Sequence, residues 1–91
     1  MANDQHPLLG ALGLCRKAGK LRHGYDRVQE KALCGKVALV LLAADASERT
    51  VTHMQAACEG VVPCRRMPLT TADLAVLTPK PAAVFGITDE H

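Results

Sequence analysis

Aromatic side chains are almost absent from this chain. Tyr25 and Phe85 are the only members of the Phe, Tyr and Trp group, which makes up 2% of the residues. A core without large rings has to be built from aliphatic side chains. The scarcity also excludes one common device for holding single-stranded nucleic acid, an array of rings on which successive bases stack.

Long hydrophobic runs and a secretory signal are also missing. The longest apolar run, Val37 to Ala44, suits a buried strand and is too short to cross a membrane. Four cysteines lie within aliphatic patterns, with no secretory signal before them: Cys15, Cys34, Cys58 and Cys64. This pattern favours reduced thiols in the cytoplasm over a disulfide framework, and it predicts no membrane partner.

Motifs for cofactors and metals are lacking too. The chain contains neither G-x-G-x-x-G nor G-x-x-x-x-G-K-[ST], the two common phosphate-cradling loops of nucleotide sites. Five residues separate Cys58 from Cys64, which does not match a zinc pair. No ligand spacing relates the four histidines, His6, His23, His53 and His91. We therefore expect no cofactor and no metal.

No catalytic constellation is visible. An enzyme that works by nucleophilic catalysis needs a nucleophile, a base and an oxyanion donor in one place. Cys34, near Lys31 and Lys36, is the nearest candidate for a nucleophile, but a buried small hydrophobic role is expected for it. The sequence predicts a protein without catalytic residues.

The features that are present indicate one small globular domain. The chain has 91 residues, of which 48% are hydrophobic, so residues 1–91 form a single domain with a modest core, and residues 1–6 are expected to be loose. Net charge is only +2, yet the stretch from Arg16 to Lys36 holds seven basic residues against two acidic ones. Such clustering is typical of a phosphate-facing edge, and equally of a solvated helix face.

The hydrophobic pattern predicts helices that alternate with short strands. Gly19 is placed to end the first helix, and Gly24 to open the second by a tight turn. The expected helices are Leu8–Gly19, a second one from Gly24, a third one capped by Asp45 or Ser47 and ended by Gly60, and a short one from a capping box at Thr70–Asp73 to about Thr78. The expected strands are Lys20–His23, Val37–Ala43, Val61–Cys64 and Ala82–Thr88.

The strand Val37–Ala43 is apolar at every position, without polar alternation. Such a strand is buried on both faces, as in a sheet that helices cover on both sides. The sequence therefore predicts an α/β fold, a three-layer α/β/α sandwich.

Two strand-to-helix turns, at Gly24 and at Ala44–Ser47, would lie at the same edge of the sheet if their strands are parallel neighbours. Ligands of open α/β sheets bind at this edge, where helix N-termini offer free backbone N–H groups to anions. Arg22, Arg27 and Lys31 are close by in sequence. The edge suits an anionic partner, and a polyanion fits it better than a single nucleotide.

A block of spaced motifs carries a resemblance to a known family. It comprises Gly19-Lys20-Leu21, Gly24 at a helix start, Gly35-Lys36 before Val37–Ala43, Asp45, and the closing segment TPKPAAVFGITDE. From Leu8 to Asp89 the chain resembles the kink-turn RNA-binding ribosomal protein superfamily, the large-subunit L-seven-Ae and L-thirty-e group, and in particular its short bacterial YlxQ-type members. The resemblance implies a mixed four-stranded sheet in the sandwich.

The resemblance also implies an RNA site made of the turn into the second helix, the turn after the second strand and the loop before the last strand. Gly24 would let the backbone approach sheared G·A pairs, and the proline loop would offer an apolar wall to an extruded base. With neighbouring residues, the expected RNA-binding set is Arg22, His23, Gly24, Tyr25, Asp26, Arg27, Glu30, Lys31, Ala44, Asp45, Ala46, Ser47, Pro79, Lys80, Pro81 and Ala82.

Two departures from the family pattern stand out. Strong kink-turn binders have Asn-Glu after the glycine and a lysine three residues beyond that glutamate, whereas this chain has Tyr25-Asp26-Arg27 and then Glu30. Acids in an anionic groove are unfavourable, and Lys31 replaces the lysine only if the helix register allows it. Family members also usually continue into a final helix after the last strand, and this sequence stops at His91.

The expected function is non-catalytic binding of a structured, kink-turn-like RNA, such as ribosomal RNA, by a cytoplasmic monomer. A rival reading stays open: a protein–protein adaptor that docks to the ribosome or its biogenesis factors without reading RNA.

Overall fold

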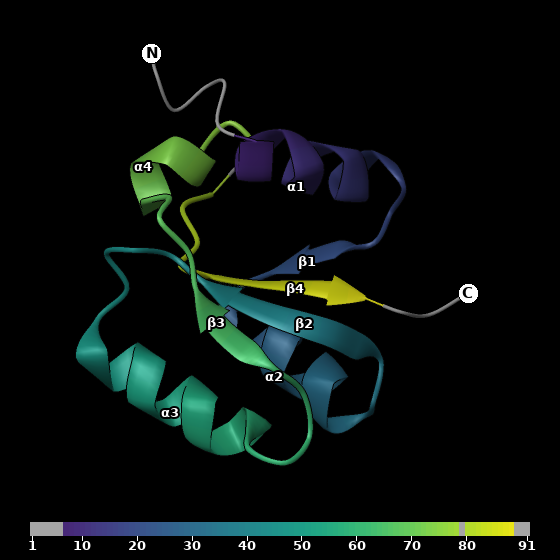
Figure 1. Ribbon diagram of the computed structural model, residues 1–91, viewed down its shortest axis with the longest axis vertical. Coiled ribbons are helices and arrows are strands. Elements are labelled where there is room, and N and C mark those ends of the chain that lie inside the picture. The colour runs from purple at the N-terminus through teal and green to yellow at the C-terminus, as the bar shows by residue number, and fades with distance from the viewer. Residues whose placement is uncertain (1–6, 79, 89–91) are drawn as a thin grey trace.

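The computed structural model describes residues 7–78 and 80–88 (Figure 1). In chain order the elements are α1 (Pro7–Lys17), β1 (Leu21–His23), α2 (Tyr25–Leu33), β2 (Val37–Leu42), α3 (Glu48–Cys58), β3 (Cys64–Arg66), α4 (Thr71–Leu74) and β4 (Val84–Thr88). The expectations for residues 1–6, Pro79 and Asp89 lie outside the described residues.

The four strands form one mixed sheet in the order β1-β4-β2-β3. β4 runs antiparallel to both β1 and β2, and β3 runs parallel to β2. Helices α1 and α4 lie on one face of the sheet and α2 and α3 on the other (Figure 1). The expected three-layer α/β/α sandwich with a mixed four-stranded sheet is therefore confirmed. β1 and β2 are parallel but not neighbours, because β4 lies between them.

Each face of the sheet has its own hydrophobic core, and the buried side chains of both are aliphatic apart from Phe85 on the α1/α4 face. On the α1/α4 face, Leu12, Leu41 and Phe85 are the central buried side chains. On the α2/α3 face the buried set is Val28, Ala32, Val37, Val40, Leu42, Met54, Cys58, Val62 and Val84. The alternation of β2 between the two clusters explains its continuous apolar run, since both faces of this strand meet a core.

Local sequence signals fix most of the element ends. Gly19 ends α1 with a positive φ of 74°, a conformation that glycine adopts without steric cost. Ser47 caps α3 by accepting a hydrogen bond from the Thr50 amide. Thr70 and Asp73 form the expected capping box, in which each side chain accepts from the other residue's backbone N–H.

The expected bounds of three elements were wrong. The third strand is Cys64–Arg66 rather than Val61–Cys64, because the amides of Val61 and Val62 both bond to the Cys58 carbonyl and close a turn there. β4 starts at Val84 instead of Ala82, and α4 ends at Leu74, with a further turn that bonds Leu77 to the Leu74 carbonyl.

Gly86 lets α2 lie close against the sheet. A Cβ at this position would come within 3.1 Å of a Val28 methyl and 3.4 Å of a Val37 methyl, both in a packed core. We expect Gly86→Val to lower the free energy of unfolding by about 1–3 kcal/mol through overpacking. Urea unfolding followed by circular dichroism measures the change, and Gly10→Val, at an exposed helical position with open space around it, is the control. Equal losses of unfolding free energy in Gly86→Val and Gly10→Val would contradict the close approach of α2 to the sheet at Gly86.

Candidate nucleic-acid interface

Three loops that are far apart in sequence meet at one edge of the sheet. β1 and β2 end at this edge, and β4, which runs the other way between them, begins there. The Gly24 amide donates to the Val84 carbonyl at 3.0 Å, and the Ala43 amide donates to the Ala83 carbonyl at 2.8 Å. Val84, the first residue of β4, is thus bonded to the Gly24 turn, and Ala83 just before it is bonded to the residue that precedes the Ala44–Ser47 turn. The sequence-predicted edge is formed by these three segments, with β4 between its two turns.

The N-terminus of α2 presents its backbone N–H groups as hydrogen-bond donors at this edge. Its N-cap, Gly24, has φ 97° and ψ 138°, and no side chain accepts from the first-turn amides of the helix. A Cβ on Gly24 would meet no atom within 4 Å, so the glycine is required by its backbone angles and leaves open space in front of the helix. In contrast, side chains cap both α3 and α4. Among the described helices that start at this edge, α2 is the one whose terminus is available to an anion.

The turn from β2 to α3 is held rigidly. Asp45 accepts 2.9 Å and 2.8 Å hydrogen bonds from the backbone N–H and the hydroxyl of Thr71, at the start of α4. These two bonds lower the pKa of Asp45 below its ordinary value, which keeps the carboxylate ionised. Asp45 therefore ties the turn to α4, and the methyl groups of Ala44 and Ala46 leave this part of the edge small in side-chain volume.

The loop before β4 supplies an apolar side of the edge. Pro81 is exposed and Ala82 half-buried, and the Lys80 carbonyl accepts a 2.6 Å hydrogen bond from the Thr78 hydroxyl. This bond and the proline ring restrict the loop conformation. Lys80 adds an exposed cation beside the proline. Pro79 lies outside the described residues.

Charges on α2 separate into two rows. Asp26 and Glu30 are four residues apart, as are Arg27 and Lys31, so each pair shares one side of the helix. Arg27 is exposed in the first turn, next to the uncapped terminus. Tyr25 packs partly against the α2/α3 core and has a structural role besides any contact with a ligand. The edge is thus mixed in charge, with a basic row and an acidic row that both start at its open helix end.

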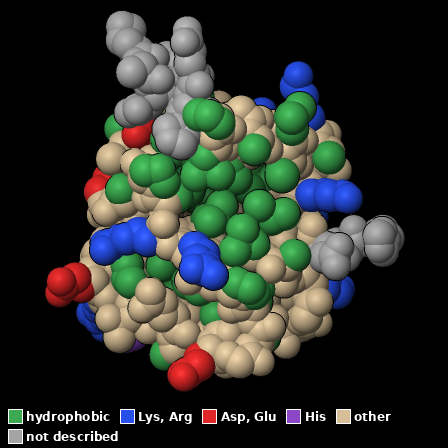
Figure 2. Space-filling view, in the orientation of Figure 1, with side chains coloured by type: hydrophobic (Ala, Val, Ile, Leu, Met, Phe, Trp, Pro, Cys, Tyr) green, Lys and Arg blue, Asp and Glu red, His purple; other side chains and the backbone are tan. Residues whose placement is uncertain are grey.

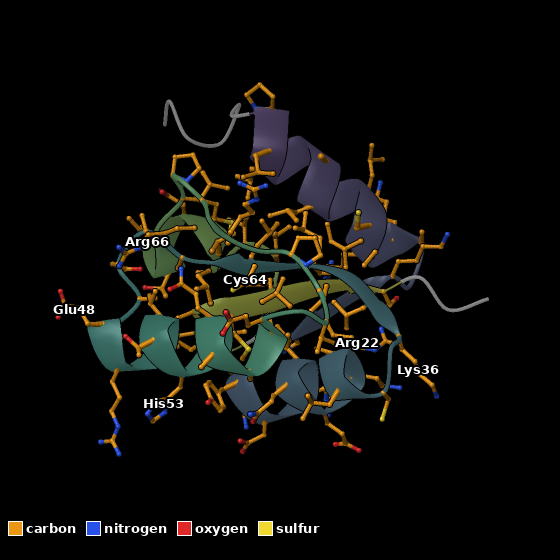
Figure 3. The ribbon with its side chains drawn as sticks, turned by 60° about the horizontal axis from the view of Figure 1, so that its bottom comes forward. Arg22, Lys36, Glu48, His53, Cys64 and Arg66 are labelled. Atoms are coloured by element: carbon orange, nitrogen blue, oxygen red, sulfur yellow. The ribbon has the colours of Figure 1, made fainter. Side chains whose placement is uncertain are left out.

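Arg22 does not join this edge. Its guanidinium donates to the Gly19 carbonyl at 3.1 Å and to the Leu21 carbonyl at 3.3 Å, at the beginning of β1. Figure 3 shows Arg22 and Lys36 near one end of the sheet, far from Arg66 and Glu48 at the other. His23 turns its ring toward Phe85, with the centroids 6.4 Å apart. Of the expected residues around Gly24, Arg22 points to the opposite end of the sheet.

Arg66 belongs to the edge and was not expected there. Its guanidinium donates to the Ala46 carbonyl at 3.1 Å, which brings a cation to the turn after β2 (Figure 3). Sequence reasoning missed it because the third strand was placed three residues too early. A strand at Cys64–Arg66, parallel to β2, ends at the same edge as β2.

The cysteines are free thiols in different surroundings. Cys34, expected to be buried, is exposed, because it follows the end of α2 at a surface turn. Burial raises the pKa of Cys58, and burial together with the neighbouring Cys58 raises the pKa of Cys64 to about 11. Both line a cavity of about 500 Å³ between the end of α3 and the start of β3, away from the edge described above.

These environments predict the order of thiol reactivity. At neutral pH a maleimide reagent is expected to modify Cys34 first and to leave Cys58 and Cys64 protected. Because the pKa of Cys64 rises from 9.0 to about 11 on folding, the folded state holds its proton longer. Stability is then expected to fall as pH rises from 9 to 11, and less steeply in Cys64→Ala. Mass spectrometry and alkaline unfolding measure the two effects, and early labelling of Cys64 at neutral pH would refute them.

Within residues 7–78 and 80–88 no group of three or more His, Cys, Asp and Glu side chains is arranged to hold a metal ion. The helices described for this chain include none long and apolar enough to cross a membrane.

Comparison with known proteins places the chain in a family. The sequence profile of the ribosomal protein L7Ae/L30e/S12e/Gadd45 family matches residues 7–90. The chain belongs to this family. The match spans all eight elements, including the three segments that form the edge. No curated protein matches the sequence.

Solved structures of similar fold support this placement. A protein of unknown function from Bacillus halodurans superimposes with a TM-score of 0.83 at 24% identity, over 93% of this chain and 87% of its own. The 15.5 kD RNA binding protein of Giardia lamblia superimposes with a TM-score of 0.78 at 25% identity, over 91% of this chain and 72% of its own. The fold is therefore that of the family.

Proposed function

We propose that this protein binds a structured, kinked RNA through the edge formed by the N-terminus of α2, the Ala44–Ser47 turn and the loop before β4. The role involves recognition without catalysis. We further propose that the protein is a short bacterial YlxQ-type member of its family, that it acts in the cytoplasm as a monomer, and that its target is ribosomal RNA or another RNA with kink-turn-like geometry.

The observation that carries the proposal is the convergence of three loops around an uncapped helix end. Free backbone N–H groups at the start of α2 suit a phosphate, and Gly24 leaves room for a nucleic-acid backbone to come close. The exposed Pro81 gives an unstacked base an apolar surface. Arg27, Arg66 and Lys80 supply cations around it, without forming the broad basic surface of a non-specific binder.

The comparisons favour RNA as the ligand. The family includes ribosomal proteins, and the similar protein from Giardia lamblia is an RNA binding protein. Asp26 and Glu30 lower the RNA affinity expected of this chain, because Asp26 is exposed in the first turn of α2 and Glu30 is exposed one turn further along. We therefore expect shape-dependent recognition of moderate affinity.

A binding experiment with two RNAs tests this function. The purified protein is titrated into a fluorescently labelled kink-turn RNA and into a straight duplex of equal length, each over a salt series. We expect tighter binding of the kinked RNA at every salt concentration, because contacts with an unstacked base and a bent backbone persist when phosphate contacts are screened. Equal affinities that collapse together as salt rises would refute specific recognition.

A further inference from the structure

Two thiols from different elements meet at the cavity between α3 and β3. Cys58 is the last residue of α3 and is only 1% exposed, whereas Cys64 is the first residue of β3 and is half-buried. Cys64 is in register with Val40 and packs against the same core as Cys58, on the side of the sheet that faces α3 (Figure 3). There the Cys64 thiol donates a hydrogen bond to the sulfur of Cys58. The two side chains are therefore in direct contact.

Backbone hydrogen bonds hold both cysteines in place. The turn at residues 59–63 joins them, and the Val62 amide at this turn donates to the Cys58 carbonyl at 3.0 Å. At the other end of the turn, the Pro63 carbonyl accepts a 2.9 Å hydrogen bond from the Val40 amide of β2. One cysteine is thus fixed to α3 and the other to the sheet, so the contact between the thiols is built into the fold.

The cavity brings this pair within reach of small molecules. Its volume is about 500 Å³, and its lining residues Gln55, Glu59 and Pro63 are exposed, so it opens at the surface. Cys64 is the more exposed of the two thiols that line it. Within the part of the chain that the structure describes, no third His, Cys, Asp or Glu completes a metal site with them. The chemistry open to the pair is therefore that of a dithiol.

We propose that Cys58 and Cys64 form a redox modification site, at which a small organic disulfide oxidises the two thiols to one intramolecular disulfide. The new bond joins the end of α3 to the start of β3, and a thiol reductant reverses it. β3 runs parallel to β2 and so begins at the end of the sheet opposite the edge at Gly24. The modification is therefore separate from RNA binding and does not rest on it.

The oxidation proceeds in two exchange steps. The Cys64 thiolate attacks one sulfur of the organic disulfide, whose S–S bond breaks, and the first organic thiolate leaves. The Cys58 thiolate then attacks the Cys64 sulfur and displaces the second organic thiolate. The two protons lost by the cysteines end on these two leaving groups, so the cysteine pair is oxidised and the organic disulfide is reduced to two thiols. Because the cysteines already touch, the second step is intramolecular, and the mixed disulfide does not accumulate.

Burial affects the rate of this exchange. It raises the pKa of both Cys58 and Cys64, and the thiolate is the attacking form, so the reaction is slow at neutral pH. The position of the equilibrium depends instead on how well the fold holds the two sulfur atoms together. The decisive measurement is therefore made at equilibrium, with both thiols accessible at the start.

Peptide mapping at redox equilibrium tests the proposal. The reduced protein is equilibrated with 2-hydroxyethyl disulfide and its thiol, once in native buffer after dilution from urea and once with the urea kept in place. The reagent is neutral because Lys and Arg side chains lie over β3 (Figure 2) and Glu59 is exposed at the cavity. After alkylation of the remaining thiols, the tryptic peptide from Thr50 to Arg65 reports on the pair, since it contains Cys58 and Cys64 and no other cysteine.

The mass of this peptide distinguishes the products. An internal disulfide removes two hydrogen atoms, whereas a mixed disulfide adds the reagent. We expect the ratio of internally oxidised to reduced peptide to be at least about tenfold higher in native buffer than in urea, because the fold holds the thiols together. Cys34, which is exposed, takes up the reagent in both samples and is the internal control. A ratio that is equal in the two samples, or lower in native buffer, would leave the pair with a packing role alone and overturn the proposal.

Thermal unfolding gives a second measurement. The oxidised protein is expected to melt at least about 5 °C above the reduced protein, because the covalent link restricts the unfolded chain, and dithiothreitol should restore the lower value. In Cys64→Ser, a change at a half-buried position, the same oxidation should leave the melting temperature unchanged. A rise of equal size in Cys64→Ser, or no rise in the unsubstituted protein, would also overturn the proposal. Neither readout involves RNA, so a failure here is distinct from a failure of the RNA proposal.

Discussion

Gly24→Ala is expected to cause the largest combined loss of stability and RNA affinity. The φ of 97° and ψ of 138° at this position are strained for any residue with a Cβ, so the free energy of unfolding should fall by about 1–3 kcal/mol. A side chain would also occupy the open space before α2, where we place the RNA backbone. Kink-turn affinity should fall by roughly tenfold or more, beyond what any unfolded fraction explains. Urea unfolding and fluorescence titration measure the two effects.

Gly10→Ala is the matched control for this prediction. Gly10 lies on an exposed position of α1, has no positive φ, and has no atom within 4 Å of the added Cβ. The change should stabilise the protein by up to about 1 kcal/mol, since alanine favours the helix, and RNA affinity should stay the same. If Gly24→Ala kept full affinity and stability, the role of the glycine in the site would be wrong.

Reversal of the charge at Arg27 is expected to cause the second large loss of RNA affinity. Arg27 is exposed in the first turn of α2, beside the uncapped amides, and Arg27→Glu would put an acid at the point where we place a phosphate. We expect kink-turn affinity to fall by roughly tenfold or more at low salt, with a smaller loss at high salt. Fluorescence titrations at two salt concentrations measure the change.

Lys36→Glu is the control with the same change in net charge. Lys36 is exposed near the other end of the sheet, with Arg22 (Figure 3). It should alter affinity by no more than about threefold, through the long-range field alone. Asp26→Asn, which removes an acid from the same helix turn as Arg27, should tighten binding. Similar losses in Arg27→Glu and Lys36→Glu would show that only net charge matters and would contradict a localised site.

The layers of the fold could be predicted from the sequence because its local signals agree with one another. The continuous apolar run of β2 required cover on both faces, and Gly19, Ser47 and the Thr70–Asp73 capping box marked helix ends that the structure confirms. Such signals depend on a residue and its close neighbours along the chain. They are therefore accessible without knowledge of tertiary contacts.

Boundaries set by distant contacts were less accessible. The valines at 61 and 62 have a high preference for strands, yet Cys58 accepts both of their amides and holds them in a turn. This shift of β3 also concealed Arg66, whose place at the edge depends on where β3 ends beside β2. In the same way, no spacing rule gives the position of β4 between β1 and β2.

The candidate site was only partly predictable for the same reason. The turns at Gly24 and Ala44–Ser47 follow from strand ends, and the structure brings both together with the loop before β4. The orientation of Arg22 does not follow from its position, because its guanidinium folds back onto the Gly19 carbonyl instead of continuing toward Gly24. Asp45, expected in the RNA site, accepts hydrogen bonds from Thr71 with both of its carboxylate oxygens.

Backbone amide shifts measured by NMR during titration with a kink-turn RNA test the central claim most directly. The claim is that one sheet edge binds the RNA. We predict that the largest shift changes fall on residues 24–27, 44–47 and 80–83, with small changes at Lys36 and along the exposed side of α3. Changes centred on Leu39 and Ile87 on the α1/α4 side of the sheet, or spread evenly over the basic residues of the surface, would contradict it.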